Sequence, residues 1–471
     1  MARGTWSEGE GKVRAGFYMR FIAAAMARVQ PGMRGIVAIP VKANWGPPNE
    51  VVEIEDVNQL QNIYDFGGTA YKSIYLALLG QPKLVLGYRM TDGNEKVASV
   101  TLKDTADTDV IKLETLYPTT RAFNVSVKES LGDPSKIELT LFEGTAKKYT
   151  IILDKGSIDD IVNAINSDSN NVYLKAIKVA DGNGTLQNVS NQPLTGGNDG
   201  MDSITNQQYI DAMAAFEARQ FDAFALDGAT DVALQTTVAS WTKRLRDEGK
   251  KIISFMGGSL EDDKDPETGN TRSRGFNHEG IVNVTVSAKL DGTWYSSAEV
   301  ACYVAGLVSG QALNESATYA ATPFDDVSPR LTNSQIISGI QAGSFLLVHD
   351  GEKVVCEKGI NTLTSLRTGQ NESFKKIKPV RIMDAIEMDT AKTAHEAYIG
   401  KIPNNDDGQN ALLSAIKNYF ETLAPTLIAD DFVVEVDEEM MKNAASDEFY
   451  WKYTATIIDS MERIYGTGYV R

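Results

Sequence analysis

The sequence contains few of the residues that usually carry chemistry. Its 471 residues include only two cysteines and three histidines. Cys302 and Cys356 have neither the spacing of a zinc site nor the pattern of a disulfide framework. Cys302 falls in an apolar run at 300–307, so we expect a buried free thiol there. These shortages argue against a metal centre and against a small secreted fold held together by disulfides.

Long hydrophobic runs and excess positive charge are also missing. No stretch approaches the roughly 20 apolar residues that cross a bilayer, so we expect no direct membrane insertion. A short apolar run at 21–27 follows basic residues, but Arg28 ends it at once, so we expect an amphipathic turn and not an export signal. The net charge of −17 argues against nucleic acid as a partner, because wrapping it requires clustered Lys and Arg.

The chain is long, and its pattern of apolar, polar and turn residues changes several times. Its length exceeds that of one ordinary core and predicts several domains. Two segments without a core of their own, 1–30 and 458–471, are predicted to be an N-terminal and a C-terminal arm. Between them we predict three domains: an outer α/β domain at 31–89 and 196–327, an inserted β-sandwich domain at 90–195 and a mixed α+β core domain at 328–457.

Strands and helices alternate on both sides of the insertion. The hydrophobic pattern predicts helices at 57–66, near 209–216, at 234–245 and at 298–309. Strands are expected at 36–40, 51–54, 83–88, 223–227, 251–256 and 281–286. Strands separated by helices of this length imply right-handed crossovers, so we expect a parallel sheet.

The insertion has short alternating segments separated by turns. We expect strands at 97–102, 122–127, 136–142 and 148–153, which is typical of a β-sandwich or barrel. One helix is expected at 157–166, with Ser157 as N-cap and Asp159 and Asp160 in its first turn.

The C-terminal region mixes both kinds of element. A helix through Ile336 and Ile340 should end at Gly343, and 345–349 with 353–357 should form a hairpin. Apolar residues at helical spacing predict a helix at 412–423, and alternation predicts a half-buried strand at 451–457.

Candidate ligand loops have simpler structural interpretations. Gly196, Gly197 and Gly200 lack the Gly-Lys-Ser/Thr ending of a phosphate loop, so we expect a turn that enters a helix. The turns at 92–94 and 181–184 do not continue into a calcium-binding ladder. The acidic stretch at 435–439 is expected to be solvated or to face a partner. We therefore predict no metal and no cofactor.

A catalytic site is also not expected. Ser259 follows a strand and Asp227 ends the neighbouring one, as in many hydrolases. However, Ser259 lacks a Gly-x-Ser-x-Gly elbow and opens a charged loop at 261–265 that we expect to be solvated. A base would have to come from three histidines, of which we expect His278 in a loop, His349 in a hairpin turn and His395 on a helix surface.

The two ends carry apolar residues without an evident partner. The N-terminal arm holds Trp6, Phe17, Tyr18 and Phe21, and the C-terminal arm holds Ile464, Tyr465, Tyr469 and Val470. A lone terminal strand is unstable unless another sheet edge accepts it, so we expect these residues to form contacts between subunits. A frayed tail, or a strand added to its own domain, remains open as an alternative.

The order of several motifs carries a family resemblance. The C-terminal motifs are GINTLTS at 359–365, YIGK at 398–401 and DSMERIY at 459–465. Earlier segments add GIVAIP at 35–40, NWGP at 44–47 and LTGGNDG at 194–200. In this order the chain resembles the sheath proteins of contractile phage tails and phage tail-like particles.

The resemblance implies a structural subunit and not an enzyme. It implies six-fold rings of this chain, stacked as a helical sleeve around a tail tube, which contract to drive the tube through a bacterial envelope. Region 328–457 would be the sheath core domain, and the outer α/β domain would be subtilisin-like without protease activity. Expected partners are further copies, the tube protein, and baseplate and tail terminator proteins, with assembly in the host cytoplasm and final location in a virion tail or tail-like particle.

Two other functions remain open from the sequence. The chain could be an α/β hydrolase-like enzyme with an appended β domain, although its few histidines and missing nucleophile elbow weigh against this. It could also be another virion or surface-layer structural protein.

Overall fold

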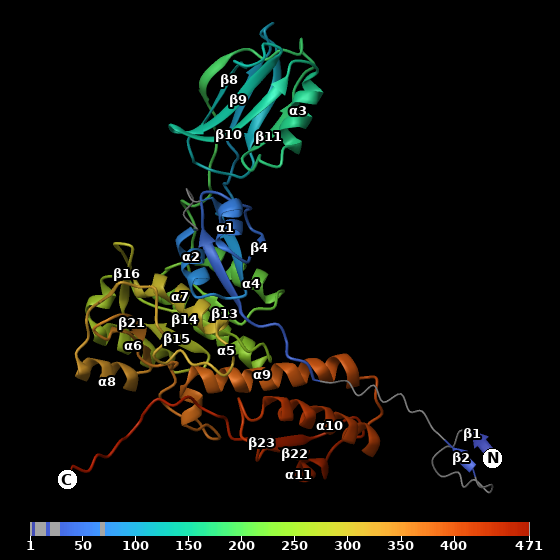
Figure 1. The fold of residues 1–471 in the computed structure, drawn as a ribbon, viewed down its shortest axis with the longest axis vertical. Helices are drawn as coiled ribbons and strands as arrows, with labels where there is room; N and C mark the ends of the chain where they lie inside the picture. Colours follow the sequence, from blue (N-terminus) through green and yellow to red (C-terminus); the bar gives the residue numbers. More distant parts are fainter. Residues whose placement is uncertain (1, 5–15, 19–28, 66–70, 471) are drawn as a thin grey trace. The chain divides into compact units, whose positions relative to one another are not determined.

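The computed structural model describes residues 2–4, 16–18, 29–65 and 71–470 (Figure 1). Internal contacts divide the chain into two compact units. Unit 1 comprises Ala385–Ile458 with the described part of Met1–Gly32, and unit 2 comprises Met33–Asp384 with Asp459–Arg471.

Unit 2 is built on a seven-stranded sheet. Its strand order is β19-β15-β14-β13-β3-β5-β4, and every neighbouring pair is parallel except β4 with β5. The strands are β3 (Ile36–Lys42), β4 (Val51–Ile54), β5 (Leu84–Met90), β13 (Ala223–Ala225), β14 (Ile253–Met256), β15 (Ile281–Val284) and β19 (Ser344–Phe345). The predicted parallel sheet is therefore confirmed.

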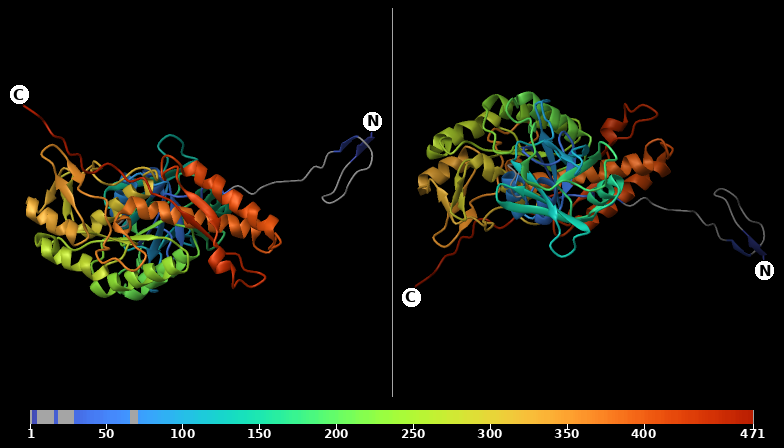
Figure 2. Two further views of the ribbon diagram at one scale, coloured as in Figure 1. Left: turned by 90° about the horizontal axis from the view of Figure 1, so that it is seen from below. Right: turned by 90° about the horizontal axis from the view of Figure 1, so that it is seen from above.

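Alternate side chains of β3 enter two different cores. Val37 and Ile39 pack in one cluster, and Ile36 and Ala38 pack in the other, because successive strand residues point to opposite faces. Helices α1 (Val57–Tyr64), α2 (Tyr71–Leu79) and α7 (Ser297–Gly310) contribute to the first cluster. Helices α4 (Asn206–Glu217) and α5 (Val232–Asp247) contribute to the second. The green helices of residues 206–276 lie along one side of the unit in Figure 2.

Helices α2 and α7 cross at a glycine. A Cβ atom on Gly306 would lie 2.0 Å from the carbonyl oxygen of Ala77, so only glycine allows this approach. Helix α2 was not expected from the sequence.

Residues 99–193 of unit 2 form two facing sheets, which confirms the predicted β-sandwich. One sheet has the order β10-β9-β8-β12 and the other β11-β7-β6. The elements are β6 (Ser99–Lys103), β7 (Asp109–Thr115), β8 (Phe123–Glu129), β9 (Lys136–Glu143), β10 (Ala146–Asp154), α3 (Ile158–Ser167), β11 (Leu174–Lys178) and β12 (Val189–Pro193). Ser157 caps α3 by accepting a hydrogen bond from the Asp160 N–H, as predicted.

The core of the sandwich also contains Trp45, which precedes both sheets in the chain. Its indole is buried, with ring centroids 5.4 Å from Tyr117 and 5.5 Å from Phe123. The Arg121 guanidinium lies 5.3 Å from the same ring. The NWGP segment thus supplies a core residue to the inserted domain.

The remaining elements of unit 2 lie between the last strands of the sheet and after them in the chain. Its elements are η1 (Asp262–Lys264), α6 (Pro266–Phe276), β16 (Ser287–Leu290), β17 (Thr293–Tyr295), β18 (Asp326–Ser328), α8 (Asn333–Gln341), β20 (Leu347–His349), β21 (Val354–Cys356) and η2 (Glu372–Lys375). The hairpin β20–β21 and helix α8, followed by Gly343 at φ +77°, agree with the prediction. The short helix η1 and helix α6 occupy a stretch for which only loop was expected.

Helix α9 (Ile377–Thr393) begins in unit 2 and ends in unit 1. Unit 1 continues with a π-helical turn (Ala394–Tyr398), α10 (Asp406–Leu423), β22 (Val433–Val436), α11 (Glu438–Met441) and β23 (Trp451–Thr454). Phe420 of α10 packs against Phe432 and Tyr453, and β22 pairs antiparallel with β23. The described part of the N-terminal arm forms a parallel pair, β1 (Ala2–Gly4) with β2 (Gly16–Tyr18).

Candidate functional site

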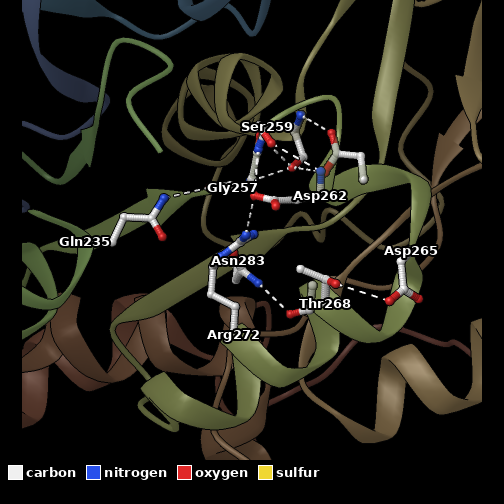
Figure 3. Close-up of polar contacts among 12 residues, drawn as sticks. Gln235, Gly257, Ser259, Asp262, Asp265, Thr268, Arg272 and Asn283 are labelled. Carbon is white, nitrogen blue, oxygen red and sulfur yellow. Dashed lines mark hydrogen bonds and ion pairs between the residues drawn. The ribbon is translucent and has the colours of Figure 1, made fainter. Parts of the chain in front are cut away.

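Ser259 lies in the turn between β14 and η1 and bonds locally to Asp262 (Figure 3). Its N–H donates to Asp262 Oδ2 at 3.1 Å, and its Oγ accepts from the Asp262 N–H at 3.1 Å. Arg272 donates to the same Asp262 oxygen at 2.9 Å. Within the described part of the chain no histidine is hydrogen-bonded to Ser259.

Asp227 lies where the strand order of the sheet reverses, between β3 and β13. Open α/β sheets commonly bind ligands at this point. Here Tyr209 Oη donates to Asp227 Oδ1 at 2.7 Å, and the Lys42 N–H donates to Oδ2 at 3.1 Å. Burial raises the pKa of the Asp227 carboxyl. The protein itself therefore occupies both oxygens of this carboxylate.

The three histidines serve local structure. His278 is buried, and its Nδ1 accepts from the Gly280 N–H at 3.0 Å, while burial lowers its pKa to about 4. His349 Nδ1 accepts from the Gly351 N–H in the hairpin turn, and His395 pairs with the Ala391 carbonyl on α9. His278 lies in a loop and His395 on a helix surface, as predicted, whereas His349 is the last residue of strand β20 and lies beside the hairpin turn.

The charged loop at 261–265 is not fully solvated, which corrects the sequence-based expectation. Asp263 is only 3% exposed and accepts from the Ser297 N–H at 2.7 Å and from Ser297 Oγ at 2.5 Å. Its carboxylate thereby meets the N-terminus of α7, where negative charge is favourable. Burial nevertheless raises the pKa of Asp263 to about 6.

The glycine-rich turn at 196–200 is a junction between the sandwich and the α/β sheet. A Cβ atom on Gly197 would lie 2.1 Å from the Thr119 carbonyl oxygen. The buried Arg89 donates to the carbonyl oxygens of Gly46 at 2.6 Å, Pro118 at 2.8 Å and Asp199 at 3.0 Å. The turn therefore has the structural role expected of it.

The GINTLTS segment joins neighbouring elements through side-chain hydrogen bonds. Asn361 Nδ2 donates to the Phe374 carbonyl at 2.7 Å, and Thr362 Oγ1 donates to the His278 carbonyl at 3.0 Å. Asn277, which ends α6 in a left-handed conformation at φ 39°, accepts from the Thr364 N–H at 2.8 Å. This motif is thus part of the framework.

The remaining acidic residues and cysteines do not form a binding site in the described part of the chain. Over residues 29–65 and 71–470, no group of three His, Cys, Asp or Glu side chains is arranged to hold a metal ion. In the same part of the chain, no helix has the length and apolar character to span a membrane. The acidic stretch at 435–439 includes Glu435, which is paired with Lys452 at 3.4 Å. Cys302 and Cys356 are buried free thiols, as expected for Cys302.

The four apolar residues that were predicted to contact other subunits lie on one exposed segment, the C-terminal arm. Ile464, Tyr465, Tyr469 and Val470 are between 81% and 100% exposed. The last backbone pairing is that of the Ile458 N–H with Leu427 O at 2.9 Å, and residues 459–470 have no backbone–backbone hydrogen bond to any described residue. On the N-terminal arm, Phe17 and Tyr18 lie in β2, whereas Trp6 and Phe21 lie outside the described residues.

Sequence models of phage tail sheath domains match four segments that together span most of the chain. They are a tail sheath protein Gp18 domain III N-terminal region at 34–77, a β-sandwich domain at 91–199, a central domain at 202–362 and a C-terminal domain at 369–471. The chain belongs to the phage tail sheath protein family.

Relatives and solved sheath structures agree with this assignment. The phage-like element PBSX protein XkdK of Bacillus subtilis is 27% identical, with 99% of each chain covered. The tail sheath protein of Clostridium phage phiCD119 is 28% identical over 49% of this chain and 61% of that protein. A sheath tail protein from Desulfitobacterium hafniense is 26% identical, with a TM-score of 0.71 over 94% of this chain and 100% of that one. This sheath protein is therefore a structural subunit of a contractile phage tail or tail-like particle.

Some residues of this sheath protein were missed by the sequence reasoning. Lys358, Lys376 and Glu462 hold the first residues of the arm. The available signal was the pair of acidic residues, Asp459 and Glu462, in the DSMER segment at 459–463.

Proposed function

We propose that this chain polymerises as six-membered rings, stacked helically around a tail tube, and that the sleeve contracts to drive the tube through a bacterial envelope. The observation that carries the proposal is the C-terminal arm. Its backbone is unpaired with described residues, and its apolar side chains are exposed. Such a segment gains most by adding to a sheet edge on another molecule.

A sheet suited to accept a strand lies in unit 1. Strands β22 and β23 form a two-stranded sheet within the described residues, and Val433 and Tyr453 on it are partly exposed. A two-stranded sheet is marginally stable alone, and added strands satisfy its open edges. We propose that the arms of neighbouring copies, with Phe17, Tyr18, Trp6 and Phe21 at one end and residues 464–470 at the other, supply these strands.

The proposal includes further partners. Similar folds occur in the contracted sheath of the anti-feeding prophage, in its baseplate and in the PVC sheath complex, at 10–12% identity and TM-scores of 0.52–0.55. We infer that this chain contacts a tube protein, a baseplate and a tail terminator, and is assembled in the host cytoplasm.

The proposed domain roles follow from the same assembly. The outer α/β domain, at 31–89 and 196–327, would be subtilisin-like in fold and without protease activity, since the Ser259 hydroxyl accepts from the Asp262 N–H in a local turn. The β-sandwich at 90–195 would ride on it, and 328–457 would form the sheath core between the arms.

Electron microscopy of the purified full-length chain tests the proposal. We expect hollow cylinders with six-fold symmetry, and we expect a chain ending at Ile458 to stay unassembled while retaining its thermal unfolding transition. Ser259→Ala serves as the matched control and should form cylinders normally. Regular cylinders from the truncated chain would refute the role of the arm, and flat sheets or shells would favour another kind of structural protein.

A further inference from the structure

The first residues of the C-terminal arm are attached to unit 2 by side chains alone. Lys376 Nζ contacts Glu462 Oε2 at 2.8 Å and also contacts Asp459 Oδ2. Lys358 Nζ lies 3.7 Å from the same Glu462 oxygen. Since residues 459–463 have no backbone–backbone hydrogen bond to described residues, these contacts and that of Lys378 Nζ with Ser460 Oγ at 3.2 Å hold the start of the arm.

Glu462 is the centre of this cluster. Its other oxygen, Oε1, accepts from Thr318 Oγ1 at 2.9 Å. Thr318 is itself held, because its Oγ1 accepts from the Gly359 N–H at 2.9 Å and from Ser316 Oγ at 3.1 Å. The Glu462 side chain is only 9% exposed, so the surrounding solvent screens its pairing less than that of a surface ion pair.

Two sequence motifs meet in this cluster. Gly359 belongs to the GINTLTS segment, and Glu462 belongs to the DSMERIY segment. Ile360 forms a β-bridge with Lys376, which aligns the lysine beside that segment. The GINTLTS segment thus positions Thr318 and Lys376, which contact Glu462 of the arm.

We propose that Glu462, held by Lys376, Thr318 and Lys358, is a clasp that fixes the point and direction at which the arm leaves its own subunit. This inference rests on the proposed function, since its purpose is to aim the arm at a neighbouring copy. Residues 459–462 stay with their own unit 2, and only residues from Arg463 onward cross to another molecule. At about 3.3 Å per residue, the segment 463–470 reaches about 26 Å.

A spin label at the arm root tests the clasp in the unassembled chain. The native thiols Cys302 and Cys356 are buried, and Met461 is 83% exposed, so Met461→Cys offers a selective attachment point. We expect a restricted electron paramagnetic resonance spectrum in the otherwise native chain. Glu462→Lys or Lys376→Glu should convert it to a mobile spectrum, and the two changes combined should restore restriction in part.

Lys375→Glu is the matched control. Lys375 neighbours Lys376 but pairs with Glu372, which is 79% exposed and outside the clasp. This variant should leave the label restricted. Equal mobility in all variants, or an equal effect of Lys375→Glu and Lys376→Glu, would overturn the clasp.

Cylinder formation separates the clasp from the proposed function. With the clasp broken, we expect a reduced yield of cylinders, at least several-fold, because the arm leaves in many directions. If the label responds as described but the native chain forms no cylinders, the proposed function fails and the clasp stands. If cylinders form equally well from every variant, the clasp does not aim the arm.

Discussion

Arg246 of α5 and Asp384 of α9 form a buried two-bond ion pair. Arg246 Nη1 lies 2.9 Å from Asp384 Oδ2, and Nη2 lies 2.8 Å from Oδ1. The paired geometry matches the planar guanidinium to the planar carboxylate, which is the strong form of this interaction. It ties the middle of α9 to α5, which packs against the α/β sheet of unit 2.

Replacing Asp384 with alanine should destabilise unit 2. The change leaves a buried guanidinium without its carboxylate, which costs about 3 kcal/mol or more of the free energy of unfolding. Chemical denaturation of the full chain measures the loss. Glu248→Ala, which removes an exposed pair with Arg244, should cost less than about 0.5 kcal/mol. Similar losses in both variants would contradict the assigned role.

Replacing Asp263 with asparagine should change how stability depends on pH. Burial raises the pKa of Asp263 to about 6, so between about pH 4 and 6 the folded state holds a proton that the unfolded state has released. Its contribution is therefore fully present below about pH 4 and is lost as pH rises through 6. Relative to Asp263→Asn, the native chain should lose about 2–3 kcal/mol of unfolding free energy between pH 4 and 7. A constant difference across this range would refute the shift.

His278 should give a pH dependence of stability opposite to that of Asp263, with stability lost as the pH falls. Burial lowers its pKa to about 4, so the folded state holds the ring neutral while the unfolded state takes up a proton below about pH 6.5. The stabilisation is present above pH 6.5 and is lost as pH falls through 4. His278→Asn keeps an acceptor for the Gly280 N–H but does not titrate. Urea unfolding of both chains from pH 4 to 7 should show the native chain losing stability relative to the variant at acid pH.

Gly466 tests whether the arm pairs as a strand. Proline at this position removes an N–H and restricts the preceding residue, so Gly466→Pro should impair cylinder formation. Gly466→Ala is the control, because no atom lies within 4 Å of an added Cβ. Normal cylinders from the proline variant, seen by electron microscopy, would count against strand addition.

Periodicity in the sequence was sufficient to predict most of the regular elements. In segments such as 36–40 and 412–423, the side chains that face the core are apolar. They therefore recur in the sequence with the period of the strand or helix. Helix α6 has a polar sequence with Gly269 and Gly275 inside it, so no such pattern exists. Its buried side chains, Asn270 and Ser273, are polar and bond to the neighbouring strands, as Ser273 Oγ does when it accepts from Asn283 Nδ2 of β15 at 2.8 Å. The Asp265–Pro266 pair at its start was the available signal.

Charged side chains were harder to place than apolar ones. In the run 261–265, only Asp263 is buried, because it faces the α7 N-terminus from a distant part of the chain. Likewise, Glu462 and Lys376 are far apart in sequence. A local sequence pattern cannot indicate which charged residue pairs with a group that is distant in the sequence. It does indicate that the segment beyond Arg463 has no core of its own.

The indole of Trp45 gives the β-sandwich an unusual dependence on its host. Because this ring packs against Tyr117 and Phe123 from a position upstream of the insertion, a fragment limited to 90–195 has a hollow where the tryptophan belongs. Moving the β-sandwich domain between sheath proteins therefore requires moving the NWGP segment with it. Otherwise the recipient must already have an aromatic side chain at the position of Trp45.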